Sequence, residues 1–206
     1  MRRRWLIAAS MKLPVAMVGL GLAGCGLSER PYLERRDWPL TVPPPAREGA
    51  SVRGRTLLLR GTQAGPGLEA RGLQSLQPDG SVRTDYYESW SVPPAQGAEA
   101  TLRQWLEASG RFSAVLAPGS RMSADWVMET TLTALVADPT HNVARASLSM
   151  VVLDQRTGTP RVLAQRVFSA EAPLTAGAEV PARVAAMRTA LGSVFEQILQ
   201  SLGNLP

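Results

Sequence analysis

The stretch DWVMETTLTALV, residues 125–136, alternates apolar and polar side chains with a period of two. One parity carries Trp126, Met128, Leu132 and Val136, and the other carries Glu129, Thr131 and Thr133. Alternation of this kind is typical of a β-strand with one buried and one exposed face. The stretch is therefore predicted to be a long strand whose apolar face lies on the hydrophobic core.

Two more strands are predicted after this one. Residues 143–153 alternate in the same way, with Leu148, Met150 and Val152 opposite Arg145, Ser147 and Ser149. Residues 161–172 alternate less regularly, but Thr157 and Gly158 before them are typical of a hairpin turn. Three consecutive strands with short links predict an antiparallel meander.

Before the meander the sequence predicts shorter strands. The runs that favour extended structure span residues 55–61, 71–76, 81–92 and 112–116. Pro78, Asp79 and Gly80 lie between the second and third runs, where proline presets a bend and glycine accepts a positive φ. We therefore expect these two runs to form a hairpin.

Two helices are predicted from apolar residues at spacings of three and four. The first spans residues 98–109, carries Leu102, Trp105 and Leu106, and should end at Gly110. The second spans residues 181–202, and its stripe consists of Val184, Met187, Leu191, Val194, Ile198 and Leu202. Strands and helices do not alternate regularly. The pattern favours an α+β fold with a largely antiparallel sheet and two amphipathic helices on one face.

The N-terminal segment has the features of a bacterial lipoprotein signal peptide. Basic residues, among them Arg2 and Lys12, precede a short apolar run over residues 13–22. The run ends in Leu22-Ala23-Gly24-Cys25, which resembles the lipobox. We expect residues 1–24 to be removed and Cys25 to carry diacylglycerol and acyl chains, with no other cofactor. An uncleaved membrane anchor is the alternative, but the run is shorter than the roughly 20 residues of a spanning helix.

Residues 25–54 are predicted to be a tether and residues 55–206 a single α+β domain. Pro39, Pro43, Pro44 and Pro45 favour extended backbone, and about 29 residues would reach about 90 Å in that form. Apolar residues in the stretch, such as Trp38 and Leu40, could instead order part of it against the domain or a neighbouring copy.

The charge balance gives no nucleic-acid signature. The signal peptide holds four of the 22 basic residues and no acidic residue, which leaves 18 basic against 17 acidic residues in the processed chain. The basic excess therefore belongs mostly to targeting. Cys25 is the one cysteine in the chain, so no disulfide can form within a single copy.

The order of these elements resembles that of the ABC-type transport auxiliary lipoproteins, a family that includes the lipoprotein subunit of the paraquat-inducible system. The resemblance rests on the lipobox and on four further signals. These signals are Tyr32-Leu33, the block of Tyr86-Tyr87 with Trp90 and Pro93-Pro94, the helical Trp105-Leu106, and the final meander and helix.

This resemblance implies a function in transport. It implies an outer-membrane lipoprotein that faces the periplasm and works with an MCE-type protein and an inner-membrane ABC transporter or permease. The cargo would be lipids or other hydrophobic molecules, and the lipoprotein would be a docking or conduit component, which several copies could form together. Gly26 after the lipidated cysteine, in place of Asp, also points to the outer membrane. A chaperone or plug for an outer-membrane β-barrel or a secretion complex is the alternative.

Candidate catalytic residues are few, and we expect no enzyme. His141 is the one histidine, which is too few for an ordinary zinc site, and it lies in a predicted turn. No G-x-S-x-G motif is present, and the G-x-G-x-x-G at residues 19–24 lies in the signal peptide. Two carboxylate pairs are expected to be solvated, and these are Asp85 with Glu88 and Asp125 with Glu129.

Tyr86, Tyr87 and Trp90 are the candidate partner-interface residues. Tyrosine and tryptophan are enriched among the residues that anchor protein interfaces. Packing in the core or on the sheet is the alternative for all three.

Overall fold

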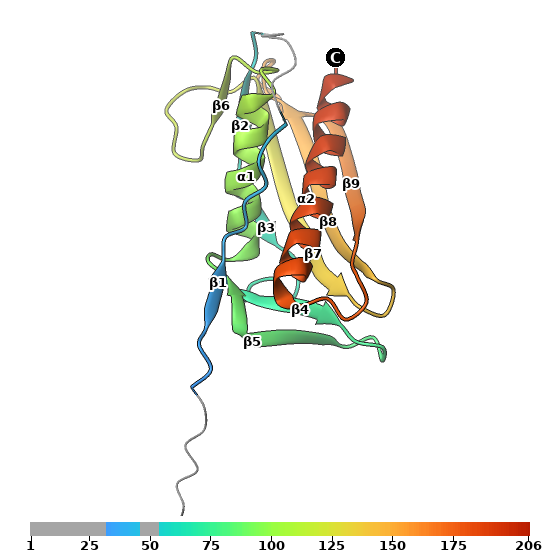
Figure 1. Ribbon diagram of the computed structural model, residues 1–206. Coiled ribbons are helices and arrows are strands. Elements are labelled where there is room, and N and C mark those ends of the chain that lie inside the picture. Colours follow the sequence, from blue (N-terminus) through green and yellow to red (C-terminus); the bar gives the residue numbers. More distant parts are fainter. Residues whose placement is uncertain (1–31, 46–53) are drawn as a thin grey trace, which may run out of the picture. The chain divides into compact units, whose positions relative to one another are not determined.

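Three long strands form the antiparallel meander that the sequence predicts. They are β7 (Trp126–Asp138), β8 (Val143–Asp154) and β9 (Arg161–Pro173), and β9 pairs with β8 alone. The computed structural model describes residues 32–45 and 54–206, of which Leu33–Pro206 form one unit (Figure 1). The predicted signal peptide and Cys25 lie outside the described residues.

A β-bulge in β7 changes which side chains reach the core. Leu132 pairs with Leu148 and Ala134 with Ser147, so Thr133 is an extra residue without an opposite partner on β8. The bulge shifts the alternation by one residue, as an inserted residue must. Leu135 and Ala137 are therefore fully buried, and Val136 lies opposite Arg145. The prediction that Val136 shares the core face is wrong for this reason.

Short strands follow one another along the other edge of β7. In order they are β2 (Thr56–Leu59), β3 (Gln63–Ala64) and β4 (Gly72–Leu76), and each runs parallel to β7. β6 (Ala114–Leu116) pairs with β2, also in parallel. The sheet of nine strands is thus largely antiparallel over its long strands, with several parallel pairs among the short ones.

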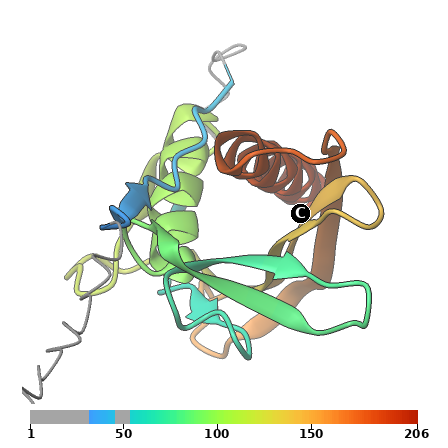
Figure 2. The same ribbon diagram turned by 60° about the horizontal axis from the view of Figure 1, so that its bottom comes forward.

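A hairpin of β4 and β5 (Val82–Trp90) extends the sheet beyond β7. Its turn contains Gly80 with a φ of 84°, in the conformation that the sequence predicts for this glycine. Figure 2 shows the hairpin crossing one end of the space between the helices and the long strands. The outer edge of β5 pairs in parallel with β1 (Arg36–Trp38).

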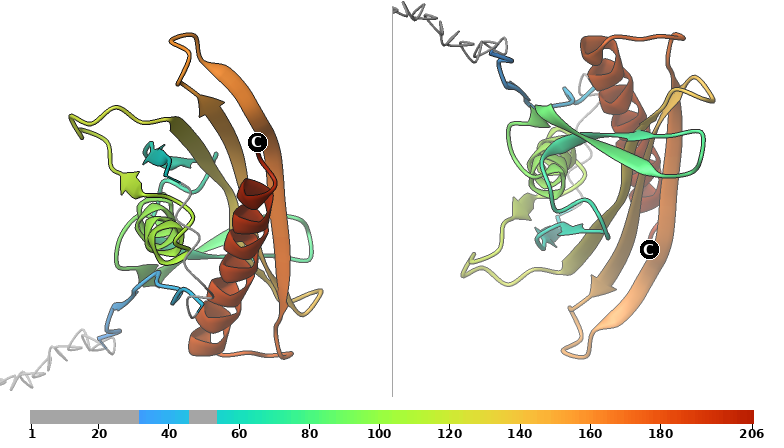
Figure 3. Two further views of the ribbon diagram at one scale, coloured as in Figure 1. Left: turned by 90° about the horizontal axis from the view of Figure 1, so that it is seen from above. Right: turned by 90° about the horizontal axis from the view of Figure 1, so that it is seen from below.

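Both helices lie on the same face of the three long strands (Figure 3). α1 (Pro94–Ala108) begins four residues before the predicted start, because Pro94 suits the first turn of a helix, and it ends before Gly110 as expected. α2 (Val180–Gly203) buries the predicted stripe against β8 and β9. Within the described residues, neither helix is long and apolar enough to cross a membrane.

Part of the predicted tether belongs to the folded unit. β1 pairs with β5, and Leu40 and Val42 are buried in the core with exposed fractions of 3% and 9%. The predicted domain boundary at Arg55 is therefore wrong over residues 36–42. The prolines of this stretch predict extended backbone, which from the sequence alone indicates a free tether. An extended segment can equally pair with a strand, as β1 does, or fill a groove, as Leu40 and Val42 do.

Candidate partner interface

A wide bulge in β5 pushes an aromatic pair out of the sheet. Gly72 of β4 lies opposite Ser89 and Gln74 lies opposite Thr84, so Asp85–Glu88 face Leu73 alone. We call residues 85–88 the aromatic bulge. The Asp85 carboxylate fixes its shape, because Oδ1 accepts hydrogen bonds from the backbone N–H groups of Tyr87 at 3.0 Å and Glu88 at 3.2 Å.

Gly72 allows β4 to pass under the aromatic bulge. A Cβ atom at this position would lie 2.5 Å from the carbonyl oxygen of Asp85 and 2.5 Å from Cγ2 of Thr84. Contacts this short require a shift of the backbone, so a side chain at residue 72 would displace the bulge. Gly72 is thus required for the backbone conformation that exposes Tyr86 and Tyr87.

The tyrosines of the aromatic bulge are exposed and ordered by neighbours. Tyr86 is 68% exposed and Tyr87 is 40% exposed, and their rings meet edge to face with centroids 5.1 Å apart. The guanidinium of Arg35 lies 4.5 Å from the centre of the Tyr86 ring, and its Nε donates to the Tyr86 carbonyl at 3.3 Å. Two exposed aromatic rings in a fixed arrangement are suited to anchoring a protein partner.

Trp90 does not belong to this surface. It is 1% exposed, and its backbone N–H donates to the carbonyl of Arg71 at 2.7 Å. Trp90 lies at the end of β5 where the strand returns to the sheet, opposite Trp38 of β1. The interface prediction for Trp90 is therefore wrong, and the core alternative holds for this residue.

Glu88 fastens β1 to the aromatic bulge. Its carboxylate is buried, accepts a hydrogen bond from Nε1 of Trp38 at 2.7 Å, and forms an ion pair with Arg36. The expectation that Glu88 is solvated is wrong, because β1 covers it and supplies both partners. The sequence held no local signal for this contact, because β1 and Glu88 lie 50 or more residues apart in the chain.

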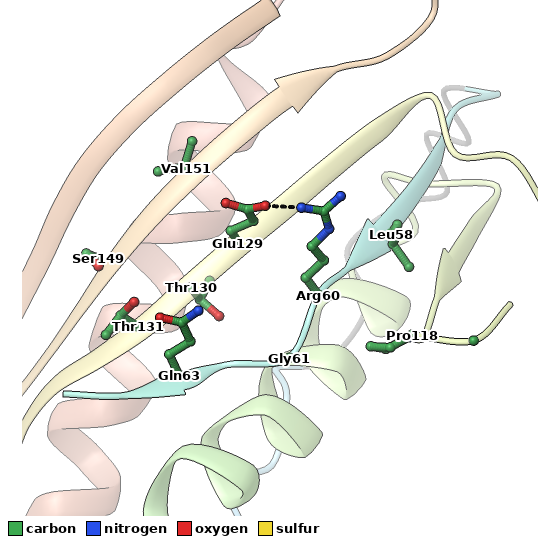
Figure 4. A pocket seen from close by; sticks show the side chains of 11 residues that line it. Leu58, Arg60, Gly61, Gln63, Pro118, Glu129, Thr130, Thr131, Ser149 and Val151 are labelled. Carbon is green, nitrogen blue, oxygen red and sulfur yellow. Dashed lines mark hydrogen bonds and ion pairs between the residues drawn. The ribbon is translucent and has the colours of Figure 1, made fainter. Parts of the chain in front are cut away.

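The helix-free face of the sheet carries an open pocket of about 610 Å³ (Figure 4). Its walls come from β2, β3 and the link between them, from β7 and β8, and from the loop after β6. Arg60 and Glu129 form an ion pair across it, and Thr131, Ser149 and Val151 line its floor. No nucleophile stands beside a histidine in this lining. The pocket was not predicted, because its residues come from four separate stretches of the chain, within residues 58–63, 118–119, 129–131 and 149–151.

The remaining candidate residues do not assemble into a catalytic site. Asp125 lies just before β7 and accepts hydrogen bonds from the N–H of Thr56 at 2.7 Å and from its hydroxyl at 3.0 Å, whereas Glu129 pairs with Arg60. The two carboxylates are thus engaged by different partners. Among the described residues, no group of three or more His, Cys, Asp or Glu residues is placed to hold a metal ion.

His141 lies in the turn between β7 and β8, as expected, and its side chain is mostly exposed. Its Nδ1 is 2.8 Å from Oδ2 of Asp138, and Nη1 of Arg145 is 3.0 Å from the same oxygen. Burial raises the pKa of the Asp138 carboxyl. The hydrogen bonds from His141 and the charges of His141 and Arg145 outweigh burial, so the pKa lies below its ordinary value of 3.8.

The stability of the protein is expected to depend on Asp138 at acid pH. Because its pKa is lower in the folded state, ionised Asp138 stabilises the fold above the ordinary pKa, and this contribution is lost as the pH falls through the folded pKa. Asp138→Asn should lower the urea midpoint at pH 7 and flatten the decline between about pH 5 and pH 3. A variant whose midpoint falls with acid as steeply as that of the wild type would contradict this.

Comparison with known proteins assigns most of the chain to one family model. The model described as ABC-type transport auxiliary lipoprotein component matches residues 39–199. No curated protein matches the chain.

Solved structures share the fold at low sequence identity. A protein of the DUF330 family from Xanthomonas campestris has 20% identity and a TM-score of 0.61, with 80% of this chain and 89% of that chain covered. An uncharacterized protein has 14% identity and a TM-score of 0.59, with 76% and 97% covered. A hypothetical protein from Chlamydia trachomatis has 12% identity and a TM-score of 0.50, with 72% and 95% covered.

Proposed function

Because this chain belongs to the family of ABC-type transport auxiliary lipoprotein components, we propose that it is an outer-membrane lipoprotein that docks an MCE-type protein. Through that protein it works with an inner-membrane ABC transporter or permease. The cargo is a lipid or another hydrophobic molecule. The family is one of transport auxiliaries, and we assign the chain no catalytic step.

The lipobox supports the anchoring part of this proposal. Cys25 stands at the position where a thioether to diacylglycerol forms, and Gly26 follows it. The family match begins at residue 39, downstream of this cysteine. The family assignment and the lipobox are thus separate observations that both indicate a lipoprotein.

The aromatic bulge is the observation that carries the docking part. Tyr86 and Tyr87 are exposed, their arrangement is fixed by Asp85 and Arg35, and β4 has a glycine where the bulge crosses it. Bulges are often features that redirect side chains toward a functional surface. We assign the contact with the MCE-type protein to this pair of rings.

The double substitution Tyr86→Ser and Tyr87→Ser is expected to weaken capture of the partner strongly. A C-terminally tagged protein is purified from membranes in mild detergent, and the proteins that accompany it are identified by mass spectrometry. An MCE-type protein should accompany the wild type and be reduced at least tenfold with the variant, because a tyrosine that is a hot spot of an interface contributes about 2 kcal/mol or more, about a 30-fold change in affinity.

Val167→Ser is the matched control for this experiment. It removes an exposed apolar side chain from β9, a different part of the sheet, and should leave capture unchanged. Thermal unfolding of all three proteins should agree closely, since exposed side chains contribute little to stability. Capture of an MCE-type protein that is equal for wild type and double variant would overturn the assignment to the bulge. Capture of a β-barrel or secretion component in its place would overturn the transport proposal.

A further inference from the structure

Residues 39–42 form a strap that lies between the two helices. Three side chains of the helices donate hydrogen bonds to its carbonyl groups. The hydroxyl of Thr101 in α1 donates to Leu40 at 2.9 Å, Nε1 of Trp105 in α1 donates to Val42 at 2.8 Å, and Nε of Arg188 in α2 donates to Pro39 at 3.1 Å. The strap thus contacts both helices at once.

Each helix has a glycine where the strap passes. A Cβ atom on Gly97 of α1 would lie 2.8 Å from Cβ of Leu40, and one on Gly192 of α2 would lie 3.0 Å from Cγ1 of Val42. Glycine within a helix costs about 0.5–1 kcal/mol relative to alanine. Both helices therefore have a helix-destabilising glycine at the points where a larger residue would clash with the strap. The groove between the helices is thus shaped to hold Leu40 and Val42.

The attachment of the strap differs from that of the rest of the chain. No backbone–backbone hydrogen bond joins residues 39–45 to another described segment, whereas β7, β8 and β9 are joined along their length. Upstream, β1 adds a three-residue pairing with β5, the contacts of Glu88, and two more hydrogen bonds, from the N–H of Ser91 to the Trp38 carbonyl at 2.8 Å and from the Ser89 hydroxyl to Asp37 at 2.5 Å. Residues 36–42 can consequently detach without breaking any pairing among β2 to β9.

Detachment would change how far the domain reaches from Cys25. With β1 in place, ten residues separate Cys25 from Arg36, and the chain between these two residues spans at most about 40 Å. If residues 36–42 detach, the next paired strand begins at Thr56, and the chain of 30 residues between Cys25 and Thr56 spans at most about 110 Å. We propose that residues 36–42 are a releasable latch that sets the reach of the domain from its anchor.

The reach rests on the anchor of the proposed function, but the latch itself does not. The test of the latch therefore uses the processed chain without lipid, in which Cys25→Ser removes the native thiol. Each test protein then carries one new cysteine, so that it has a single thiol. Val42→Cys reports opening of the latch, and Ala146→Cys, at a fully buried position of β8, reports unfolding of the sheet. Each thiol is labelled with a maleimide in buffer without denaturant, and the labelling rate is measured.

The latch predicts that the thiol at residue 42 is labelled at least tenfold faster than the thiol at residue 146. Thr101→Val together with Arg188→Met removes two donors to the strap with little change of volume. These changes should speed labelling at residue 42 by about tenfold or more, because the buried carbonyl of Leu40 is left unsatisfied and the exposed carbonyl of Pro39 loses a charged donor. They should leave the rate at residue 146 nearly unchanged.

Thr189→Val is the matched control in α2. The hydroxyl of Thr189 donates to Ala185 of its own helix and makes no hydrogen bond to the strap, so labelling at residue 42 should keep the wild-type rate. Equal rates at residues 42 and 146 would overturn the latch, since the strap would then open only when the whole domain unfolds. An equal effect of the donor variants and the control would overturn it as well. If labelling supports the latch but the lipid anchor is absent, only the change of reach fails.

Discussion

Replacing Cys25 by serine is expected to move the protein from the membrane fraction to the soluble fraction. Each methylene of an acyl chain that enters the bilayer contributes about 0.8 kcal/mol, and two chains suffice for stable anchoring. In the part of the chain that the structure describes, no helix could replace the anchor by crossing the membrane. Membranes are washed with high salt and alkali, and the protein is followed by immunoblot.

A second variant keeps this experiment decisive if the serine variant is not cleaved. A conventional cleavable secretory signal replaces residues 1–25 and is followed by Gly26, so that neither the lipid nor the apolar run of the original signal remains. We expect this protein to be soluble and folded, and the mass of the wild-type N-terminal peptide to include diacylglycerol. If the second variant stays in the washed membranes, an attachment other than Cys25 is responsible.

Phe195→Ala is expected to lower the free energy of unfolding by about 3–5 kcal/mol. Phe195 is a fully buried residue of α2, and its ring meets that of Trp105 in α1 edge to face at a centroid distance of 5.5 Å. The substitution leaves a cavity where the two helices meet over the sheet. The groove for the strap depends on the same contact between the helices, because Trp105 also donates a hydrogen bond to the carbonyl of Val42. A chain of this size should lose about 10 °C in Tm.

Chemical denaturation and thermal unfolding followed by circular dichroism test this expectation. Val167→Ala, which truncates an exposed residue of β9, is the control and should change the free energy of unfolding by less than about 0.5 kcal/mol. A loss below 1 kcal/mol for Phe195→Ala would mean that the two helices do not share a tightly packed core.

The sequence was most informative where one face of an element is buried and the other is exposed. The alternation in residues 143–153 and the stripe of residues 181–202 predicted β8 and α2 nearly to their ends. In both cases the period of the apolar residues matches the geometry of the element, so local pattern and packing agree. The turns at Gly80 and Gly158 were predictable for a similar reason, because each has a positive φ that glycine adopts easily.

Predictions failed where the deciding contact comes from a distant segment. β1 and the strap have too few residues for a pattern and stand next to a run of prolines, and their order depends on Glu88 and on the groove between the helices. Trp90 could not be placed either, because the bulge before it decides which aromatic residues of β5 face solvent. The bulge in turn depends on Gly72 of the neighbouring strand.

The bulge at Thr133 also constrains how this chain can change in evolution. Substitution of Thr133 by another small polar residue keeps the pairing of β7 with β8, because the residue has no opposite partner. Deletion of one residue between Leu132 and Leu135 would remove the bulge but leave Leu135 and Ala137 on the core face, whereas insertion of one more residue there would turn both toward solvent and Val136 toward the helices. Relatives should therefore lose a residue from this part of the strand more readily than they gain one.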